Sequence, residues 1–237
     1  MNQTSQPIIR ENKPIGNIMS LLKDISERGI DFKYILDVGA NLGEWARMAK
    51  EVFPDAVIYM IEPLSEMESN LKKICEEFPG SKYFPNGAGS KIEVHVLTTW
   101  GDDLAGANCL IPENEYIKSL NKQRMIKIIT IDSLIENNEI EIPDLVKLDI
   151  QGFELEALKG ASKILGKSEA FVLETSLFEF TNGTPLLSEV VSFMSNKGYE
   201  IYDFPGFLRR PFDGALGQID IFFAKRNGLL RNSNNWI

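Results

Sequence analysis

Gly39 and Gly43 follow a short apolar run and precede a helical pattern of residues. A strand, a glycine turn and a helix in this order are typical of nucleotide-binding sheets, where the first glycine permits a tight turn and the second permits close packing of the helix. A dinucleotide site needs a further glycine between them for the pyrophosphate, but Asn41 puts a side chain there. Asp37, just before the turn, adds a carboxylate that would repel a phosphate. The turn therefore disfavours NAD.

A cationic nucleoside without phosphates suits the same turn. S-adenosylmethionine has an ammonium and a sulfonium group, and both favour a pocket with carboxylates at its rim. We expect Asp37 to hold the ammonium group, directly or through a water molecule. Glu62 ends the next apolar run, about twenty residues beyond the turn, where an acid can accept both ribose hydroxyls. These residues predict S-adenosylmethionine as the cofactor. A helix cap with incidental acids is the alternative interpretation.

Three charged residues at the ends of later apolar runs are candidates for chemistry on the methyl acceptor. Lys147 and Asp149 share one face of a strand predicted over residues 145–150, and Glu174 ends the next strand. We interpret Asp149 as accepting a proton from the acceptor hydroxyl or orienting it, Lys147 as neutralising the cluster or binding the acceptor, and Glu174 as completing the carboxylate set. A structural lysine–acid pair is the alternative. Such acids can bind a divalent ion, but no spacing specifies one, so we predict no metal.

Apolar runs and helical patterns alternate along the chain, which predicts a mainly parallel sheet with helices on both faces. The predicted strands span residues 34–38, 56–61, 82–84, 92–97, 125–131, 145–150, 170–174, 199–204 and 219–225, and the helices span 15–29, 44–53, 67–78, 153–165 and 186–196. No helical pattern separates the last two strands, so we predict an antiparallel pair at one edge of the sheet. Residues 98–124 lack clear periodicity and predict a long loop.

Composition limits the class of protein. Residues 1–14 are polar with two prolines and predict a flexible arm, and we expect residues 15–237 to form a single domain. The net charge of -9 disfavours a nucleic-acid partner. No apolar run is long enough to span a membrane, and Cys75 and Cys109 fit free thiols in a reducing compartment. We therefore expect a cytoplasmic protein and leave open whether it forms a homo-oligomer.

Three stretches of the sequence resemble the FkbM family of methyltransferases: DVGANLG at 37–43, IEP at 61–63 and VKLDIQGFELEALKG at 146–160. The resemblance covers about residues 33–204. It implies a Rossmann-like class I methyltransferase fold with seven strands, S-adenosylmethionine as the cofactor, and O-methylation of a hydroxyl on a sugar or another small molecule. It also implies that Ala40, Asn41 and Pro63 lie at the cofactor, with Gly87 and Ala88 beside its adenine.

Gln151 departs from that family's usual pattern, Lys-x-Asp-x-Glu-Gly-x-Glu, in which a glutamate stands at this position. This difference keeps open a protein that binds S-adenosylmethionine without catalysis. An NAD-linked oxidoreductase on a similar sheet is a further alternative, against which Asn41 and the lack of a Tyr-x-x-x-Lys set argue. We interpret His95, the only histidine, as an ordinary partly buried residue.

The irregular segments are expected to recognise the methyl acceptor. Arg209 and Arg210, between the last two strands, are placed to meet a carboxylate or phosphate, or else form a charged hairpin tip. The other candidates are Trp100, Asn108, Cys109, Phe178 and Phe180.

Overall fold

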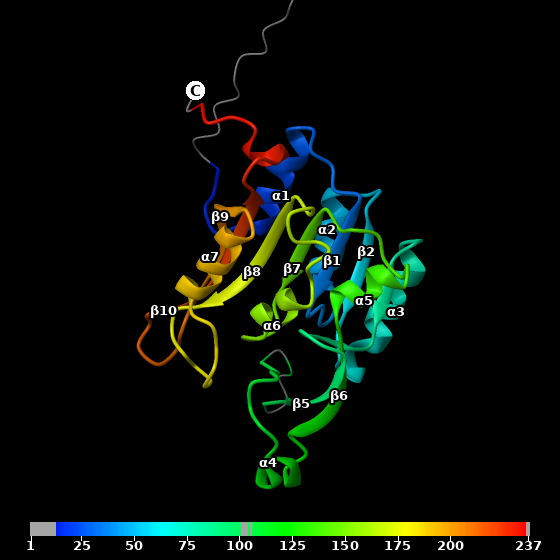
Figure 1. Cartoon of the computed structure of the whole chain (residues 1–237), viewed down its shortest axis with the longest axis vertical. Helices are drawn as coiled ribbons and strands as arrows, with labels where there is room; N and C mark the ends of the chain where they lie inside the picture. Colours follow the sequence, from blue (N-terminus) through cyan, green and yellow to red (C-terminus); the bar gives the residue numbers. More distant parts are fainter. Residues whose placement is uncertain (1–12, 101–103, 105, 236–237) are drawn as a thin grey trace, which may run out of the picture.

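Seven strands form one sheet in the computed structural model, which describes residues 13–100, 104 and 106–235. Most of the arm predicted over residues 1–14 lies outside these residues. The sheet contains β1 (Tyr34–Val38), β2 (Val57–Ile61), β3 (Lys82–Phe84), β7 (Leu145–Leu148), β8 (Ala170–Ser176), β9 (Tyr199–Arg209) and β10 (Leu216–Lys225). Their order is β3-β2-β1-β7-β8-β10-β9 (Figure 1). The first five are parallel, and β10 is antiparallel to both β8 and β9. This confirms the predicted sheet with an antiparallel pair at one edge.

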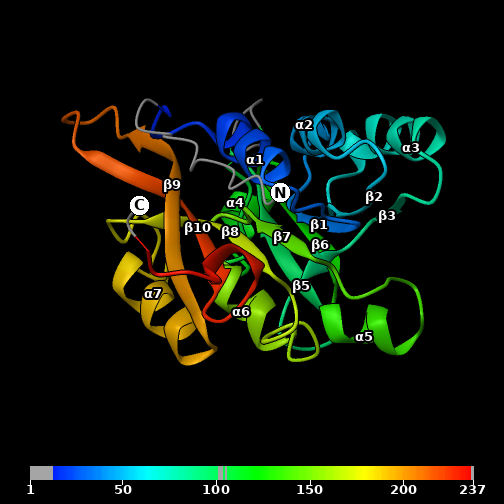
Figure 2. The ribbon, with the colours of Figure 1, turned by 90° about the horizontal axis from the view of Figure 1, so that it is seen from above.

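Helices cover both faces of this sheet (Figure 2). One face carries α1 (Ile18–Glu27), α2 (Glu44–Val52) and α3 (Glu68–Glu77), and the other carries α5 (Ile131–Glu136), α6 (Glu154–Lys159) and α7 (Leu187–Asn196). Successive strand residues point to opposite faces, so Ile35 packs into the first core and Leu36 into the second. Short 3-10 helices lie at Ser65–Met67 and Leu229–Arg231. No helix in the described part of the chain is long and apolar enough to cross a membrane.

A second, three-stranded sheet was not predicted. It has the order β4-β6-β5, with β4 (Gly87–Ala88) parallel and β5 (Glu93–Thr98) antiparallel to β6 (Gln123–Ile129). The predicted loop between β5 and β6 contains one short helix, α4 (Glu115–Ser119), and its residues 101–103 and 105 lie outside the described part. Figure 1 shows this sheet and α4 extending beyond the ends of the central strands.

Several predicted elements have different bounds in the structure, and β7, predicted to reach residue 150, ends at Leu148, so that Asp149 lies just after the strand. The helix predicted over residues 153–165 ends at Lys159. Gly160 follows it and lies against the backbone of Gly89, since an added Cβ would lie 2.1 Å from the Gly89 oxygen. The strand predicted to end at residue 204 continues to Arg209. Pro205 does not interrupt it, because β9 is the edge strand and needs no hydrogen bond on its outer side.

Candidate active site

A cavity of about 650 Å³ lies at the carboxyl ends of the central strands. Its wall includes the turn after β1, the residues after β2, strand β4, the turn after β7, and parts of β8 and β10. Residues 104 and 106–109, from the long loop, cover it. In this sheet the strand order reverses beside β1, and ligands of open α/β sheets bind at that point.

The glycine turn after β1 is fixed by its neighbours. The backbone N–H groups of Gly39 and Ala40 both donate to the Ile61 oxygen, at 2.9 and 3.2 Å. Gly39 has φ +78°, and a Cβ there would lie 2.0 Å from the Asp149 oxygen. Gly43 has φ +79°, and its added Cβ would lie 2.1 Å from Cδ1 of Ile74 on α3. Only glycine therefore permits both the turn and the close approach of β7 and α3.

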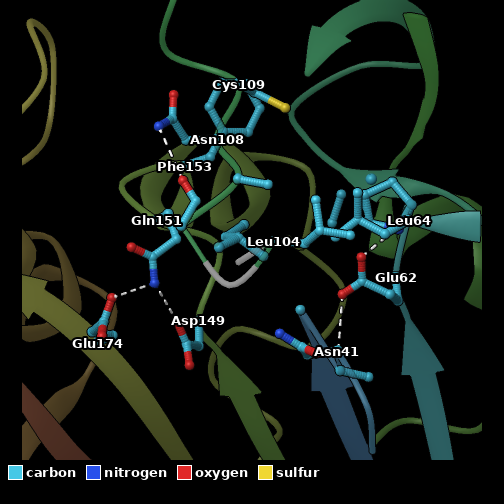
Figure 3. A pocket seen from close by; sticks show the side chains of 18 of the residues that line it. Asn41, Glu62, Leu64, Leu104, Asn108, Cys109, Asp149, Gln151, Phe153 and Glu174 are labelled. Carbon is cyan, nitrogen blue, oxygen red and sulfur yellow. Dashed lines mark hydrogen bonds between the residues drawn. The ribbon is translucent and has the colours of Figure 1, made fainter. Parts of the chain in front are cut away.

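Glu62 is held rigidly at one side of the cavity (Figure 3). Its Oε2 accepts a hydrogen bond from the Asn41 N–H and its Oε1 accepts one from the Leu64 N–H, both at 2.9 Å. Burial raises the pKa of this carboxyl group, whose residue is 4% exposed. Because each carboxylate oxygen can accept two hydrogen bonds, one position remains on each oxygen. Such a pair of positions matches two neighbouring hydroxyl groups.

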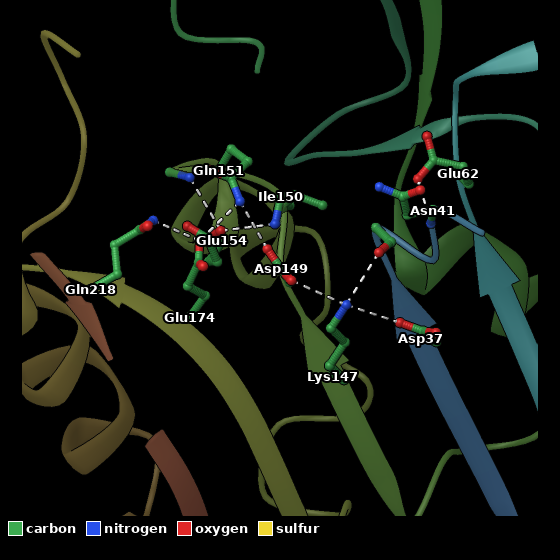
Figure 4. A network of polar contacts seen from close by, with 12 residues as sticks. Asp37, Asn41, Glu62, Lys147, Asp149, Ile150, Gln151, Glu154, Glu174 and Gln218 are labelled. Atoms are coloured by element: carbon green, nitrogen blue, oxygen red, sulfur yellow. Dashed lines mark hydrogen bonds and ion pairs between the residues drawn. The ribbon is translucent and has the colours of Figure 1, made fainter. Parts of the chain in front are cut away.

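Asp37 lies behind Lys147 and does not line the cavity. The reason is the register of the parallel strands, which places Asp37 directly beside Lys147. The ammonium nitrogen of Lys147 is 3.4 Å from Asp37 Oδ1 and 3.4 Å from Asp149 Oδ2, and it donates to the Gly39 oxygen at 3.2 Å (Figure 4). Burial alone would lower the pKa of Lys147, but Asp37 and Asp149 together outweigh it and raise that pKa. The predicted direct contact of Asp37 with a ligand is therefore not supported by its position.

Asp149 and Glu174 lie together at the end of the cavity opposite Glu62, as their positions at the ends of neighbouring strands predicted. Gln151 lies beside them. The Nε2 of Gln151 donates to Asp149 Oδ1 at 3.1 Å and to Glu174 Oε2 at 3.0 Å (Figures 3 and 4). Gln218 Nε2 donates to the same Glu174 oxygen at 2.8 Å. Burial, followed by the charges of neighbouring acids, raises the pKa of Glu174 to about 9.

Glu154 holds the turn that carries Gln151. Its Oε1 accepts hydrogen bonds from the N–H groups of Ile150, at 2.9 Å, and Gly152, at 3.2 Å. Within this turn Gln151 and Gly152 have φ values of +54° and +96°. Burial raises the pKa of Glu154 to about 7. Glu154 therefore serves the backbone of the turn and not the cavity.

The side of the cavity near Glu62 has an apolar wall. Gly87 and Ala88 of β4 line it with Pro63 and Leu64. A Cβ on Gly87 would lie 2.6 Å from Cδ1 of Ile128, so the backbone of β4 lies flat against β6. This side of the cavity therefore presents small and apolar groups.

The structure divides the candidates for acceptor recognition. Of these candidates, Asn108 and Cys109 line the cavity. Gln151, Leu208 and Gln218 line it as well, and the sequence reasoning had not assigned them to acceptor recognition. Gln218 and Asp220 share a face of β10, and Asp220 pairs with Glu174 of β8, so the pairing of these two strands brings Gln218 to the cavity. The remaining candidates, Trp100, Phe178, Phe180, Arg209 and Arg210, are not part of the cavity wall.

Arg210 and His95 both have partners within the structure. Arg210 pairs with both carboxylate oxygens of Asp213, at 2.7 and 2.5 Å, and lies over the ring of Phe178 at 3.8 Å. His95 Nε2 lies 3.1 Å from the backbone oxygen of Cys109. Burial raises the pKa of the Cys109 thiol to about 12. Among residues 13–100, 104 and 106–235, no three His, Cys, Asp or Glu side chains form a group that could hold a metal ion.

Known proteins are similar to this chain in sequence. A model of the family described as "Methyltransferase FkbM domain" matches residues 37–201. Hexuronic acid methyltransferase AglP of Haloferax volcanii is 25% identical over 166 residues, which make up 70% of this chain and 64% of AglP. The chain thus matches less than two thirds of the length of AglP. Methyltransferase sdnD of Sordaria araneosa is 22% identical over 196 residues, covering 71% of this chain and 74% of sdnD.

Solved structures of methyltransferases are similar in fold. An rRNA methylase from Streptococcus thermophilus is 8% identical, with a TM-score of 0.48, over 87% of this chain and 95% of that chain. The strand order and the family match together identify the fold as the Rossmann-like fold of class I methyltransferases, as predicted. Because the family match at residues 37–201 covers more than half of the chain, this protein belongs to the FkbM family of methyltransferases.

Proposed function

We propose that residues 15–237 form one domain that methylates a hydroxyl group of a sugar or another small molecule, with S-adenosylmethionine as the donor. The observation that carries this proposal is that one cavity has two acidic ends: the fixed carboxylate of Glu62 lies at one end and Asp149 lies at the other. The similarity to a hexuronic acid methyltransferase supports a saccharide as the acceptor.

The residues around the cavity fit S-adenosylmethionine. Glu62 offers one free acceptor position on each oxygen to the ribose hydroxyls, and Gly87, Ala88 and Pro63 provide an apolar wall for the adenine. The turn at 39–43 would receive the amino-acid part of the cofactor. S-adenosylmethionine, when bound, supplies a methyl group on a positively charged sulfur that transfers to a nucleophile and leaves a neutral thioether.

Asp149 acts on the acceptor hydroxyl. Its Oδ1 is held by Gln151 and its Oδ2 lies 3.4 Å from Lys147, so the carboxylate has a fixed orientation at the cavity wall. It accepts the hydroxyl proton as the new oxygen–carbon bond forms. A modest base is enough, because the donor is already activated and most of the rate comes from alignment.

An Asp149→Asn variant tests this assignment. We expect methyl transfer from labelled S-adenosylmethionine to fall by about 10²–10⁴-fold, because the amide cannot accept the proton. Calorimetry should show the affinity for S-adenosylhomocysteine, the demethylated product, within about threefold of the original protein. Asp55→Asn, at an exposed position, is the matched control and should change neither quantity. Unchanged transfer by Asp149→Asn would remove this residue from the mechanism.

A further inference from the structure

A continuous chain of hydrogen bonds forms the end of the cavity opposite Glu62. It runs from Asp149 through Gln151 to Glu174 and from there to Gln218, and all four residues line the cavity. We propose that Gln151, Glu174 and Gln218 form an acceptor subsite that selects a neutral polyhydroxyl compound and excludes acidic sugars such as hexuronates. This inference rests on the proposed function and specifies its substrate class.

The orientation of the two amides determines what the subsite offers. Both carboxylate contacts of Gln151 are made by its Nε2, and Gln218 also presents its Nε2 to Glu174. Gln151 lies beside the Asp149 carboxylate and must direct its N–H groups toward it, and Gln218 directs its own toward Glu174, so both carbonyl oxygens are left for a ligand. No described residue donates to Oε1 of Gln151 or Gln218. A ligand therefore has to bring hydrogen-bond donors, and hydroxyl groups provide them.

The backbone at Gln151 is a second, independent observation. Gln151 has φ +54°. A residue with a Cβ adopts this backbone conformation at an energetic cost, whereas glycine adopts it freely. Glu154 maintains this conformation through the N–H groups on both sides of Gln151. Strained positions that the surrounding structure maintains are concentrated at ligand sites. Here the strained turn directs the Gln151 amide between Asp149 and Glu174.

The charges around the subsite exclude a carboxylate ligand. Asp149 lines this end of the cavity, and burial, followed by the charge of Asp149, raises the pKa of Glu174 to about 9 and that of Asp220 to about 6. At pH 7 a pKa of about 9 keeps Glu174 protonated, so the carboxylate of a bound hexuronate would meet the negative charge of Asp149. Lys147 is the only cationic residue of the cavity wall among the described residues, and Asp37 and Asp149 already flank it. A hexuronate would therefore lack a free cationic partner.

Matched pairs of sugars test the inference directly. The full chain is saturated with S-adenosylhomocysteine at pH 7, and saturation-transfer NMR measures binding of the methyl glycosides of glucose, galactose and mannose and of the three corresponding hexuronates. In at least one pair the neutral member should bind about tenfold or more tightly than the hexuronate, because like charges at close range are strongly unfavourable.

Variants at Gln218 separate hydrogen bonding from charge. Gln218→Met should weaken binding of the neutral sugar about three- to tenfold through the loss of the amide, with S-adenosylhomocysteine binding unchanged. Gln218→Lys should reduce the preference for the neutral member about tenfold, since it places a cation in the subsite. Asn232→Lys, at an exposed amide, is the control and should leave the preference unchanged. Gln151→Met repeats the first test at a second position.

The outcomes distinguish this inference from the proposed function. Failure to bind S-adenosylhomocysteine overturns both. Normal binding of S-adenosylhomocysteine overturns the inference alone if hexuronates bind as tightly as their neutral counterparts, or if no neutral hexoside binds.

Discussion

Lys147 has its ammonium nitrogen 3.4 Å from both Asp37 and Asp149, with little exposure to solvent. The sequence predicted that Lys147 needs an acidic partner, because a lysine inside a buried strand is costly without one. It could not predict that the partner is Asp37, because this depends on the register between β1 and β7, which are far apart in the chain. The same register explains why Asp37 lies behind the cavity wall.

Replacing Lys147 should destabilise the fold. Lys147→Met leaves the buried Asp37 without a cation, and we expect the free energy of unfolding to fall by about 3–5 kcal/mol in urea titrations. The double variant Asp37→Asn/Lys147→Met should recover part of this loss, because no buried charge then remains unpaired. Lys23→Met removes a pair with Glu51 that is more than half exposed, and it should cost at most about 1 kcal/mol. Equal effects of Lys147→Met and Lys23→Met would contradict the assigned role.

At the scale of elements, local sequence patterns predicted those parts of the site that are formed by residues close together in the chain. The strand at 34–38 and the glycine turn have the predicted bounds, because an apolar run followed by glycine encodes both within a few residues. The second sheet was missed because β4 has only two residues, Gly87 and Ala88, and pairs with a distant strand. Gln218 was missed for a related reason, since the pairing of β10 with β8 brings it to Glu174.

A pair of glycine variants tests the close approach of the turn to β7. Gly39 and Gly29 have almost the same φ, +78° and +79°, but an added Cβ meets the Asp149 oxygen at 2.0 Å only at Gly39, and meets nothing within 4 Å at Gly29. Gly29→Ala should cost about 1–2 kcal/mol from backbone strain. Gly39→Ala should cost about 4 kcal/mol or more, and should weaken S-adenosylhomocysteine binding. Similar losses in the two variants would show that the contact is unimportant.

At the scale of the whole molecule, buried acids make stability depend on pH. The pKa values of Glu174, Glu154 and Asp220 are raised to about 9, 7 and 6, with burial as the largest cause. Between the unfolded and folded pKa values, the folded protein binds more protons than the unfolded chain. The free energy of unfolding therefore falls as the pH rises from about 5 to about 9.

Thermal unfolding across this pH range tests the linkage. The melting temperature should decrease from pH 5 to pH 9, and Glu174→Gln should decrease less steeply because the amide has no proton to lose. At pH 8.5 the melting temperature of the variant should be at least about 2 °C higher than that of the original protein. Glu141→Gln, at an exposed glutamate, serves as the control and should follow the original curve. A melting temperature that rises with pH would contradict the assigned burial of these acids.

Calorimetry with S-adenosylhomocysteine is the most direct test of the account, because it measures the cofactor site alone. We predict micromolar-range binding, no binding of NAD, and a loss of about 10- to 100-fold in affinity for Glu62→Gln. The amide of that variant can no longer accept hydrogen bonds from Asn41 and Leu64 on both sides while receiving the ribose hydroxyls. Tighter binding of NAD than of S-adenosylhomocysteine, or an unchanged affinity in Glu62→Gln, would contradict the account.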